Sequence, residues 1–203
     1  NAHIVSRAIK GISDRVLAGF ALVVLSPLML AIAFAIRLDS KGAAIFRQER
    51  TGKDGIPFTI YKYRTMIQDA QDQVEGLREL SEGSGPLFKM TEDPRVTRVG
   101  RFLRKSSLDE LPQLFNVLLG TMSLVGPRPA IESETSQYSP WVWRRLHVKP
   151  GMTGLWQVSG RSTLSWDESI RLDLKYVNNW TYFMDIKIMF RTVWVVLNRK
   201  GAW

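Results

Sequence analysis

The chain has 203 residues, of which 45% are apolar, and it carries a formal net charge of +9. This length is enough for one main domain with a hydrophobic core. The basic balance favours polyanionic partners, such as nucleic acid, an anionic membrane face or phosphorylated small molecules. The chain has no cysteine and only two histidines. It therefore has no disulfide framework or thiolate metal site, and a histidine zinc site is not expected.

The first predicted element is an apolar helix from Val16 to Leu38, whose one charge is Arg37. Its length of about 34 Å would match a hydrocarbon core of about 30 Å. Ser26-Pro27 predicts a kink at its midpoint, because proline frees the Val23 carbonyl, to which the Ser26 hydroxyl can bond. Basic residues flank both ends, which favours a re-entrant helix that dips in and returns. Base rates favour a kinked transmembrane anchor instead, so the residues alone leave both alternatives open.

The rest of the chain, 41–203, predicts a compact α+β domain that is mainly helical. Alternating residues up to about Gln48 and again from Phe58 to Tyr63, separated by a turn with Asp54-Gly55, predict a β-hairpin that delivers Lys62 and Arg64. Residues 68–80 have helical spacing, and an apolar helix should end at Gly120.

A short strand and a rigid Pro-Arg-Pro turn should follow that helix and fix the direction of Arg128. The Gly-rich stretch near Gln157 could bring backbone N–H groups close to a ligand. A last helix is predicted near Asp185 to Leu197. This helix and the stretch Trp141 to Arg145 combine aromatic and basic residues, as interfacial amphipathic helices do.

Two adjacent carboxylates, Asp109 and Glu110, follow a basic run with arginines at positions 95, 98, 101 and 104. Ser107 and Glu110 fit a helix capping box, which would make the acids structural. Pro112 argues against that box and moves the expected helix start toward the carboxylates. A helix N-terminus attracts phosphate, adjacent carboxylates can share one Mg²⁺, and aspartate can attack phosphorus. Capping and catalysis both remain open on the residues alone.

The stretch "SLDELPQLFNVLLGTMSLVGPRP", with "KYRTM" before it, "PGMTGLWQVSGR" after it and an N-terminal helix broken at Ser26-Pro27, resembles the bacterial sugar transferases. These monotopic phosphoglycosyl transferases transfer a sugar 1-phosphate from a UDP-sugar to undecaprenyl phosphate, a polyprenyl phosphate, and release UMP. The resemblance implies Mg²⁺, a re-entrant helix within residues 1–40, and a catalytic domain over 41–203. It also implies membrane lipid as a partner and the cytoplasmic face of the bacterial inner membrane as the location.

By the same resemblance, Asp109 is the nucleophile that forms a covalent phosphosugar intermediate, and Glu110 is its partner as metal ligand or acid/base. The residues that match substrate-binding positions of the family are Lys62, Arg64, Arg95, Arg104, Arg128, Gln157, Arg161, Asp173 and Tyr176, while Asp185 matches a C-terminal pattern. Tyr63, where phenylalanine is usual, is a mild departure.

The likeness to larger relatives favours UDP-glucose or UDP-galactose as the donor. The chain would then be either a compact member or the catalytic part of a larger protein, in the assembly of exopolysaccharide, capsule, O-antigen or another glycoconjugate. A homodimer is left open. The rival hypothesis is a non-enzymatic membrane scaffold or nucleic-acid binder, which the net charge would allow. The carboxylates argue against it, so no nucleic acid is expected.

Overall fold

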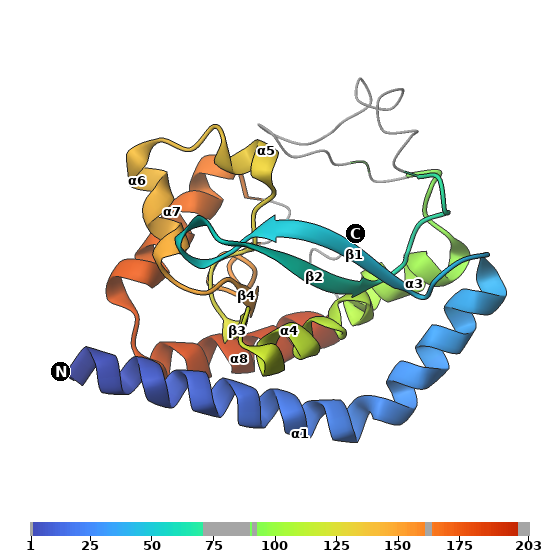
Figure 1. Cartoon of the computed structure of the whole chain (residues 1–203), viewed down its shortest axis with the longest axis horizontal. Helices are drawn as coiled ribbons and strands as arrows, with labels where there is room; N and C mark the ends of the chain where they lie inside the picture. Colours follow the sequence, from blue (N-terminus) through green and yellow to red (C-terminus); the bar gives the residue numbers. More distant parts are fainter. Residues whose placement is uncertain (1, 71–89, 91–92, 161–163, 199–203) are drawn as a thin grey trace.

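The computed structural model describes residues 2–70, 90, 93–160 and 164–198. Most of the predicted helix over 68–80 lies outside these residues. Figure 1 shows a long helix, α1, beneath a mainly helical domain that contains a β-hairpin. The longer helices and the strands are α1 (Ala2–Asp39), β1 (Ile45–Thr51), β2 (Pro57–Tyr63), α3 (Arg98–Ser106), α4 (Gln113–Leu119), β3 (Ser123–Val125), β4 (Gly151–Thr153), α7 (Trp166–Asn179) and α8 (Tyr182–Leu197). The short helical turns are η1 (Lys53–Gly55), η3 (Leu108–Glu110), α5 (Glu132–Thr135), α6 (Pro140–Trp143) and η4 (Arg144–His147).

Helix α1 contains Pro27 and is long and apolar enough over Ser6–Asp39 to cross a membrane, by length and composition alone. It runs unbroken through Ser26-Pro27, so the predicted break is a bend, which Figure 1 shows part-way along the helix. The Ser26 hydroxyl donates to the Val23 carbonyl at 2.8 Å, as predicted. Proline removes the usual backbone donor to that carbonyl, and the hydroxyl replaces it.

The predicted hairpin is confirmed, and β1 pairs antiparallel with β2. A second, smaller sheet consists of β3 and β4 in parallel. The sequence did not predict this pairing, since parallel strands are joined by long connections whose ends cannot be matched locally. Helix α4 ends at Gly120, as predicted. The predicted last helix is present as α8, which includes Asp185 in its first turn.

The core joins α1 to the domain above it. Ala18 of α1 packs with Ile60 of the hairpin and with Leu114 and Val117 of α4. A second cluster joins the far arm of α1 to Tyr63 and to Leu103 of α3. The Tyr63 hydroxyl donates to the Met29 carbonyl of α1 at 2.7 Å, which phenylalanine could not do. Tyrosine therefore adds a bond between the hairpin and α1.

The outer side of α1 exposes large apolar side chains, among them Phe20, Val23, Leu30 and Phe34. Exposed apolar side chains also lie on α3, α4 and α8: Phe102, Phe115, Leu119, Phe190, Trp194 and Leu197. Contiguous apolar surface of this kind is typical of membrane contact. The chain is therefore membrane-associated, with α1 as its main apolar element.

The sequence also placed Trp141 to Arg145 in a membrane interface. Trp141 is exposed, but its helix, α6, lies on the side of the domain away from α1 in Figure 1. Arg145 is buried. This stretch therefore does not share the apolar side of α1, and its place in a membrane interface stays a prediction.

Candidate active site

Asp109 and Glu110 lie in the turn η3, between α3 and α4. Ser107 ends α3 in the left-handed region (φ 56°) and makes no side-chain capping bond, so the capping box is absent. Pro112 directly precedes α4, which begins at Gln113. The expectation that the helix starts at the carboxylates is therefore wrong by about one turn. The left-handed residue Ser107 changes the chain direction after α3, and the turn η3 then presents the acids at the junction with α4.

A glycine sets the position of α3 against the hairpin. A Cβ atom at Gly100 would collide with the backbone carbonyl of Thr65, just after β2. Thr97 accepts a bond from the Gly100 amide through its side chain and donates its own amide to Thr65. This close approach lets the Arg104 Nε donate to the Thr65 hydroxyl at 2.9 Å. Arg104 is thereby fixed beside the carboxylate turn.

Asn116 sets the position of α4 against the same strand. Its buried amide donates to the Thr59 carbonyl at 2.6 Å and accepts from the Tyr61 amide at 3.0 Å. A side chain of α4 thus occupies the hydrogen-bonding edge of β2 as a neighbouring strand would. With α4 held there, the Lys62 ammonium lies 2.8 Å from a carboxylate oxygen of Glu110.

Asp109 is electrostatically strained. Burial, and next the adjacent Glu110 carboxylate, raise its pKa to about 6, against the attraction of Lys62 and Arg104. Burial also lowers the pKa of Arg104, while the Asp109 charge acts in the opposite direction. The site therefore holds a carboxylate whose charge is poorly solvated but faces two cations. Such an oxygen is a better nucleophile toward phosphorus than a hydrated one.

A second group of cations extends from Glu110 along the hairpin. The β1–β2 register places Arg50 on the same face as Lys62. Arg50 is half-buried, and burial, followed by the neighbouring Arg128, lowers its pKa to about 10. Arg128 makes two 3.1 Å contacts with the buried Glu134. The terminal nitrogens of Arg50 donate to the Pro129 carbonyl at 3.3 Å and to the Gln48 side chain at 2.6 Å, so Arg50 is held in place and acts on the site through its charge.

Asp173 and Tyr176 do not face this site. They lie one turn apart on α7 and are both almost fully buried. Asp173 binds Arg145, which also donates to the Arg128 carbonyl at 3.1 Å. The Tyr176 hydroxyl bonds to Val125 and to Asp185. Both residues lie behind the segment that leads to Arg128 and support it, and their contact with substrate stays a prediction.

Other predicted substrate-binding residues have bonds inside the fold. Arg64 follows the end of β2 and bonds to Ser40 and Lys41 at the end of α1. Arg95 is buried and pairs with Asp93 at 2.7 Å, although its charge still acts on Arg104. Gln157 donates to the Met152 carbonyl at 3.1 Å, and Arg161 lies outside the described residues. The three-residue spacing of the arginines could not show which of them, like Arg95, would be paired inside the fold.

Asp109 and Glu110 fit the requirements of Mg²⁺. This ion binds oxygen ligands and is commonly held by one or two carboxylates together with substrate phosphates. Over the described ranges, no cluster of three or more acidic, histidine or cysteine side chains could form a complete metal cage. A pair of carboxylates beside basic residues is thus suited to a metal ion that arrives with a phosphorylated substrate.

Residues 5–199 match the family described as bacterial sugar transferase. The chain belongs to this family. It is 47% identical over 206 residues to the undecaprenyl-phosphate galactose phosphotransferase of Salmonella typhimurium, a match that covers 98% of the chain and 42% of that relative. It is 41% identical over 208 residues to the UDP-glucose:undecaprenyl-phosphate glucose-1-phosphate transferase of Escherichia coli, again over 98% of the chain and 42% of the relative.

A shorter relative is the exopolysaccharide production protein ExoY of Rhizobium meliloti. It is 38% identical over 194 residues, which cover 94% of the chain and 86% of ExoY. The chain therefore spans less than half the length of the two longer relatives and most of the length of ExoY.

Proposed function

We propose that the chain transfers a sugar 1-phosphate from a UDP-sugar to undecaprenyl phosphate, with release of UMP. The observation that carries this proposal is the carboxylate pair at the α3–α4 junction, with Asp109 partly buried and under the influence of Lys62 and Arg104. The printed names of the Salmonella and Escherichia relatives, which describe undecaprenyl-phosphate transferases, support the substrate classes. ExoY supports a place in exopolysaccharide production.

In the proposed first step, a carboxylate oxygen of Asp109 attacks the β-phosphorus of the UDP-sugar. A bond forms between this oxygen and phosphorus, and the bond from phosphorus to the bridging oxygen breaks. The bridging oxygen leaves with the α-phosphate as UMP. The sugar phosphate remains on Asp109 as an acyl phosphate, which needs no proton transfer at the attacking oxygen.

In the second step, a phosphate oxygen of undecaprenyl phosphate attacks the same phosphorus atom and displaces Asp109. The product is an undecaprenyl diphosphate sugar, and the Asp109 carboxylate is restored. Arg104 and the Arg50–Arg128 group are placed to hold the substrate phosphates, since guanidinium groups match phosphate geometry. Lys62 orients Glu110, the proposed partner of Asp109.

Bound Mg²⁺ would screen the repulsion between these carboxylates and the diphosphate. Asp109 and Glu110 would hold it. The cations of the site attract the anionic UDP-sugar and keep its phosphates in line with the Asp109 oxygen.

Helix α1 is proposed to enter and leave the membrane on its cytoplasmic side. The bend at Pro27 and the exposed apolar side chains on both arms support this topology. The basic residues at both ends also favour one common side. Such an arrangement would keep the catalytic turn close to the phosphate of a lipid acceptor. Galactose or glucose is the proposed sugar, as in the names of the relatives.

The test is intact-mass spectrometry of the purified chain after incubation with UDP-galactose or UDP-glucose in Mg²⁺ and without acceptor. We expect one hexose-phosphate adduct and one UMP per chain. Asp109→Asn should form neither, while the exposed control Asp54→Asn should form both. Undecaprenyl phosphate should then remove the adduct. UMP release that strictly requires the acceptor, with no adduct at any time, would refute the covalent mechanism.

A further inference from the structure

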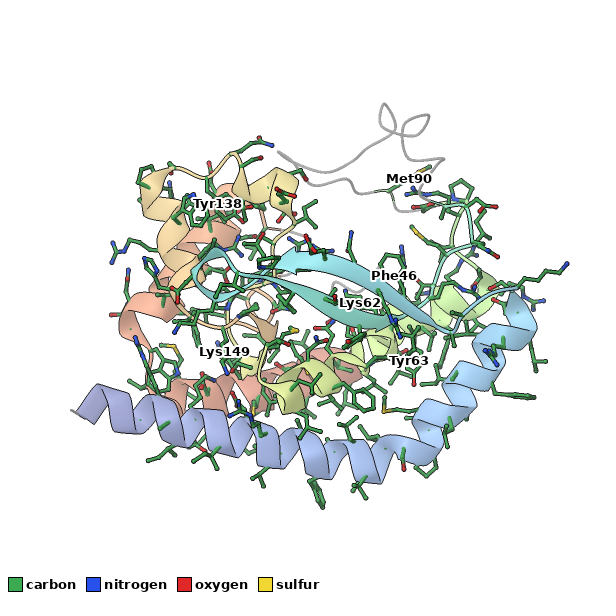
Figure 2. The ribbon with its side chains drawn as sticks, in the orientation of Figure 1. Phe46, Lys62, Tyr63, Met90, Tyr138 and Lys149 are labelled. Atoms are coloured by element: carbon green, nitrogen blue, oxygen red, sulfur yellow. The ribbon has the colours of Figure 1, made fainter. Side chains whose placement is uncertain are left out.

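A cavity of about 320 Å³ lies between the first turns of α1 and the segment that leads into β4. None of the residues proposed for catalysis lines it. Its lining includes a set of basic side chains from three separate parts of the chain: Arg7, Lys10, Arg15, Lys53, His147 and Lys149. Figure 2 shows Lys149 above the N-terminal arm of α1. The cavity is thus a second basic site, on a different part of α1 from the bend.

Two acidic side chains near this cavity, Asp14 and Asp185, already form ion pairs within the fold. Lys10 lies 2.6 Å from Asp185 and 3.5 Å from Asp14. Asp14 also accepts a 2.6 Å bond from the Ser123 hydroxyl. These contacts join α1 to α8 and to β3. Elsewhere along the cavity, Asp54 lies 3.6 Å from Lys53 and 3.3 Å from His147.

Two cations of the cavity have no direct ion pair among the described residues, although the charge of Asp14 acts on one of them, Lys149. Across residues 2–70, 90, 93–160 and 164–198, no acidic side chain forms an ion pair with Arg15 or Lys149. The printed side-chain bond of Arg15 goes to the Gly11 carbonyl in its own helix, at 3.4 Å. Lys149 is half-buried, and burial, followed by the Arg15 charge, lowers its pKa. An unpaired, partly buried cation is costly unless a ligand supplies the anion.

The cavity also has an apolar part, formed by Val117, Met122, Val148 and Trp180. Beside it, the outer side of α1 exposes Ile9, Ile12 and Val16. A basic end within an apolar wall suits an anion that is attached to an apolar group, and it also accepts a small free anion.

We propose that this cavity binds a phosphate-bearing anion, whose phosphate lies between Arg15 and Lys149. The phosphate group can come from an anionic phospholipid headgroup or from a soluble phosphate. In either case it neutralises the two unpaired cations and joins the N-terminal arm of α1 to the domain. The bound anion thereby acts as a reversible link between the membrane helix and the β3–β4 sheet.

The test compares three forms of the chain in detergent, after removal of endogenous lipid. These are the wild type, the double variant Arg15→Met/Lys149→Met, and the control Arg171→Met/Lys175→Met, which removes the same charges from an exposed face of α7. Native mass spectrometry counts bound phosphatidylglycerol against phosphatidylcholine. Thermal unfolding in increasing inorganic phosphate measures the soluble source, with sulfate-free chloride at equal ionic strength as the reference.

We expect the wild type and the control to bind the phosphate probe alike, and the double variant to bind it at least tenfold more weakly. Preference for phosphatidylglycerol over phosphatidylcholine would assign the lipid source, and stabilisation by inorganic phosphate alone would assign the soluble one. The double variant should unfold at an equal or higher temperature than the wild type without ligand, because it loses a repulsion. Equal binding by all three forms, or an equal loss in the control, would overturn the proposal.

Discussion

Replacing Asp109 with asparagine should make the folded chain more stable at neutral pH while it abolishes UMP release. The carboxylate is partly buried and lies beside Glu110, and these two causes raise its pKa from about 3.8 to about 6. Asparagine has nearly the same shape but carries no charge. The substitution therefore removes the desolvation and repulsion that the folded state must otherwise overcome.

The size of the expected stability gain follows from the pKa of Asp109 in the unfolded state and in the folded state. A raised pKa means that the folded state holds the proton more tightly, so its stabilising effect is present at low pH and is lost as pH rises through about 6. A difference of about two pKa units corresponds to roughly 3 kcal/mol near pH 7.5 and only about 1 kcal/mol near pH 4.5. In a chain of this size, 3 kcal/mol would raise the unfolding temperature by roughly 6–12 °C.

The assay is thermal unfolding of Asp109→Asn, the wild type and Asp54→Asn in one detergent at both pH values. The gain of Asp109→Asn over the wild type should be larger at the higher pH, and Asp54→Asn should stay close to the wild type. A capping carboxylate would give the opposite sign, a loss of about 1 kcal/mol. If Asp109→Asn is no more stable than the wild type near pH 7.5, the electrostatic account of the site is wrong.

Two further changes test the contacts around this turn. Lys62→Met removes a charge that lowers the pKa of Asp109. The acidic limb of the pH profile of UMP release should therefore move to higher pH by on the order of one unit. The control Lys175→Met should leave this limb in place, and an unmoved limb in Lys62→Met would contradict the prediction. Asn116→Leu leaves the Tyr61 amide without its partner and should lower the free energy of unfolding by roughly 2–4 kcal/mol in denaturant titration; unchanged stability would mean that this bond does not hold α4.

Local patterns predicted several elements because local residues determine them. The hairpin was predictable from alternation around Asp54-Gly55, and both the α4 end and the Ser26 bond followed from backbone chemistry. The carboxylate pair was found in the same way, since adjacent acids at a helix boundary are unusual for packing alone. The start of the helix that follows the pair was predicted wrongly, because no glycine or asparagine marks the left-handed turn at Ser107 in the sequence.

Contacts between distant residues could not be predicted in this way. Arg50 and Glu134 were missed, although the strand register that places Arg50 beside Lys62 could have been read from the hairpin. Asn116 appeared to be one polar residue in an apolar helix, and only its bonds to β2 explain it. Asp173 was predicted at the substrate, and its contact with Arg145 behind the segment that leads to Arg128 was missed.

The net charge of +9 has a different meaning once each cation is considered with its partners. Arg95 and Arg145 are neutralised by buried acids, so they stabilise local structure and are not available to a ligand. Arg50 and Lys149 are half-buried, and in each the pKa is lowered first by burial and next by a neighbouring arginine, Arg128 or Arg15. Cations of this second kind cost free energy in the empty fold and recover it when an anion binds. Since they lie in two separate places, the excess charge indicates two anion sites, one at the carboxylate turn and one against the N-terminal arm of α1.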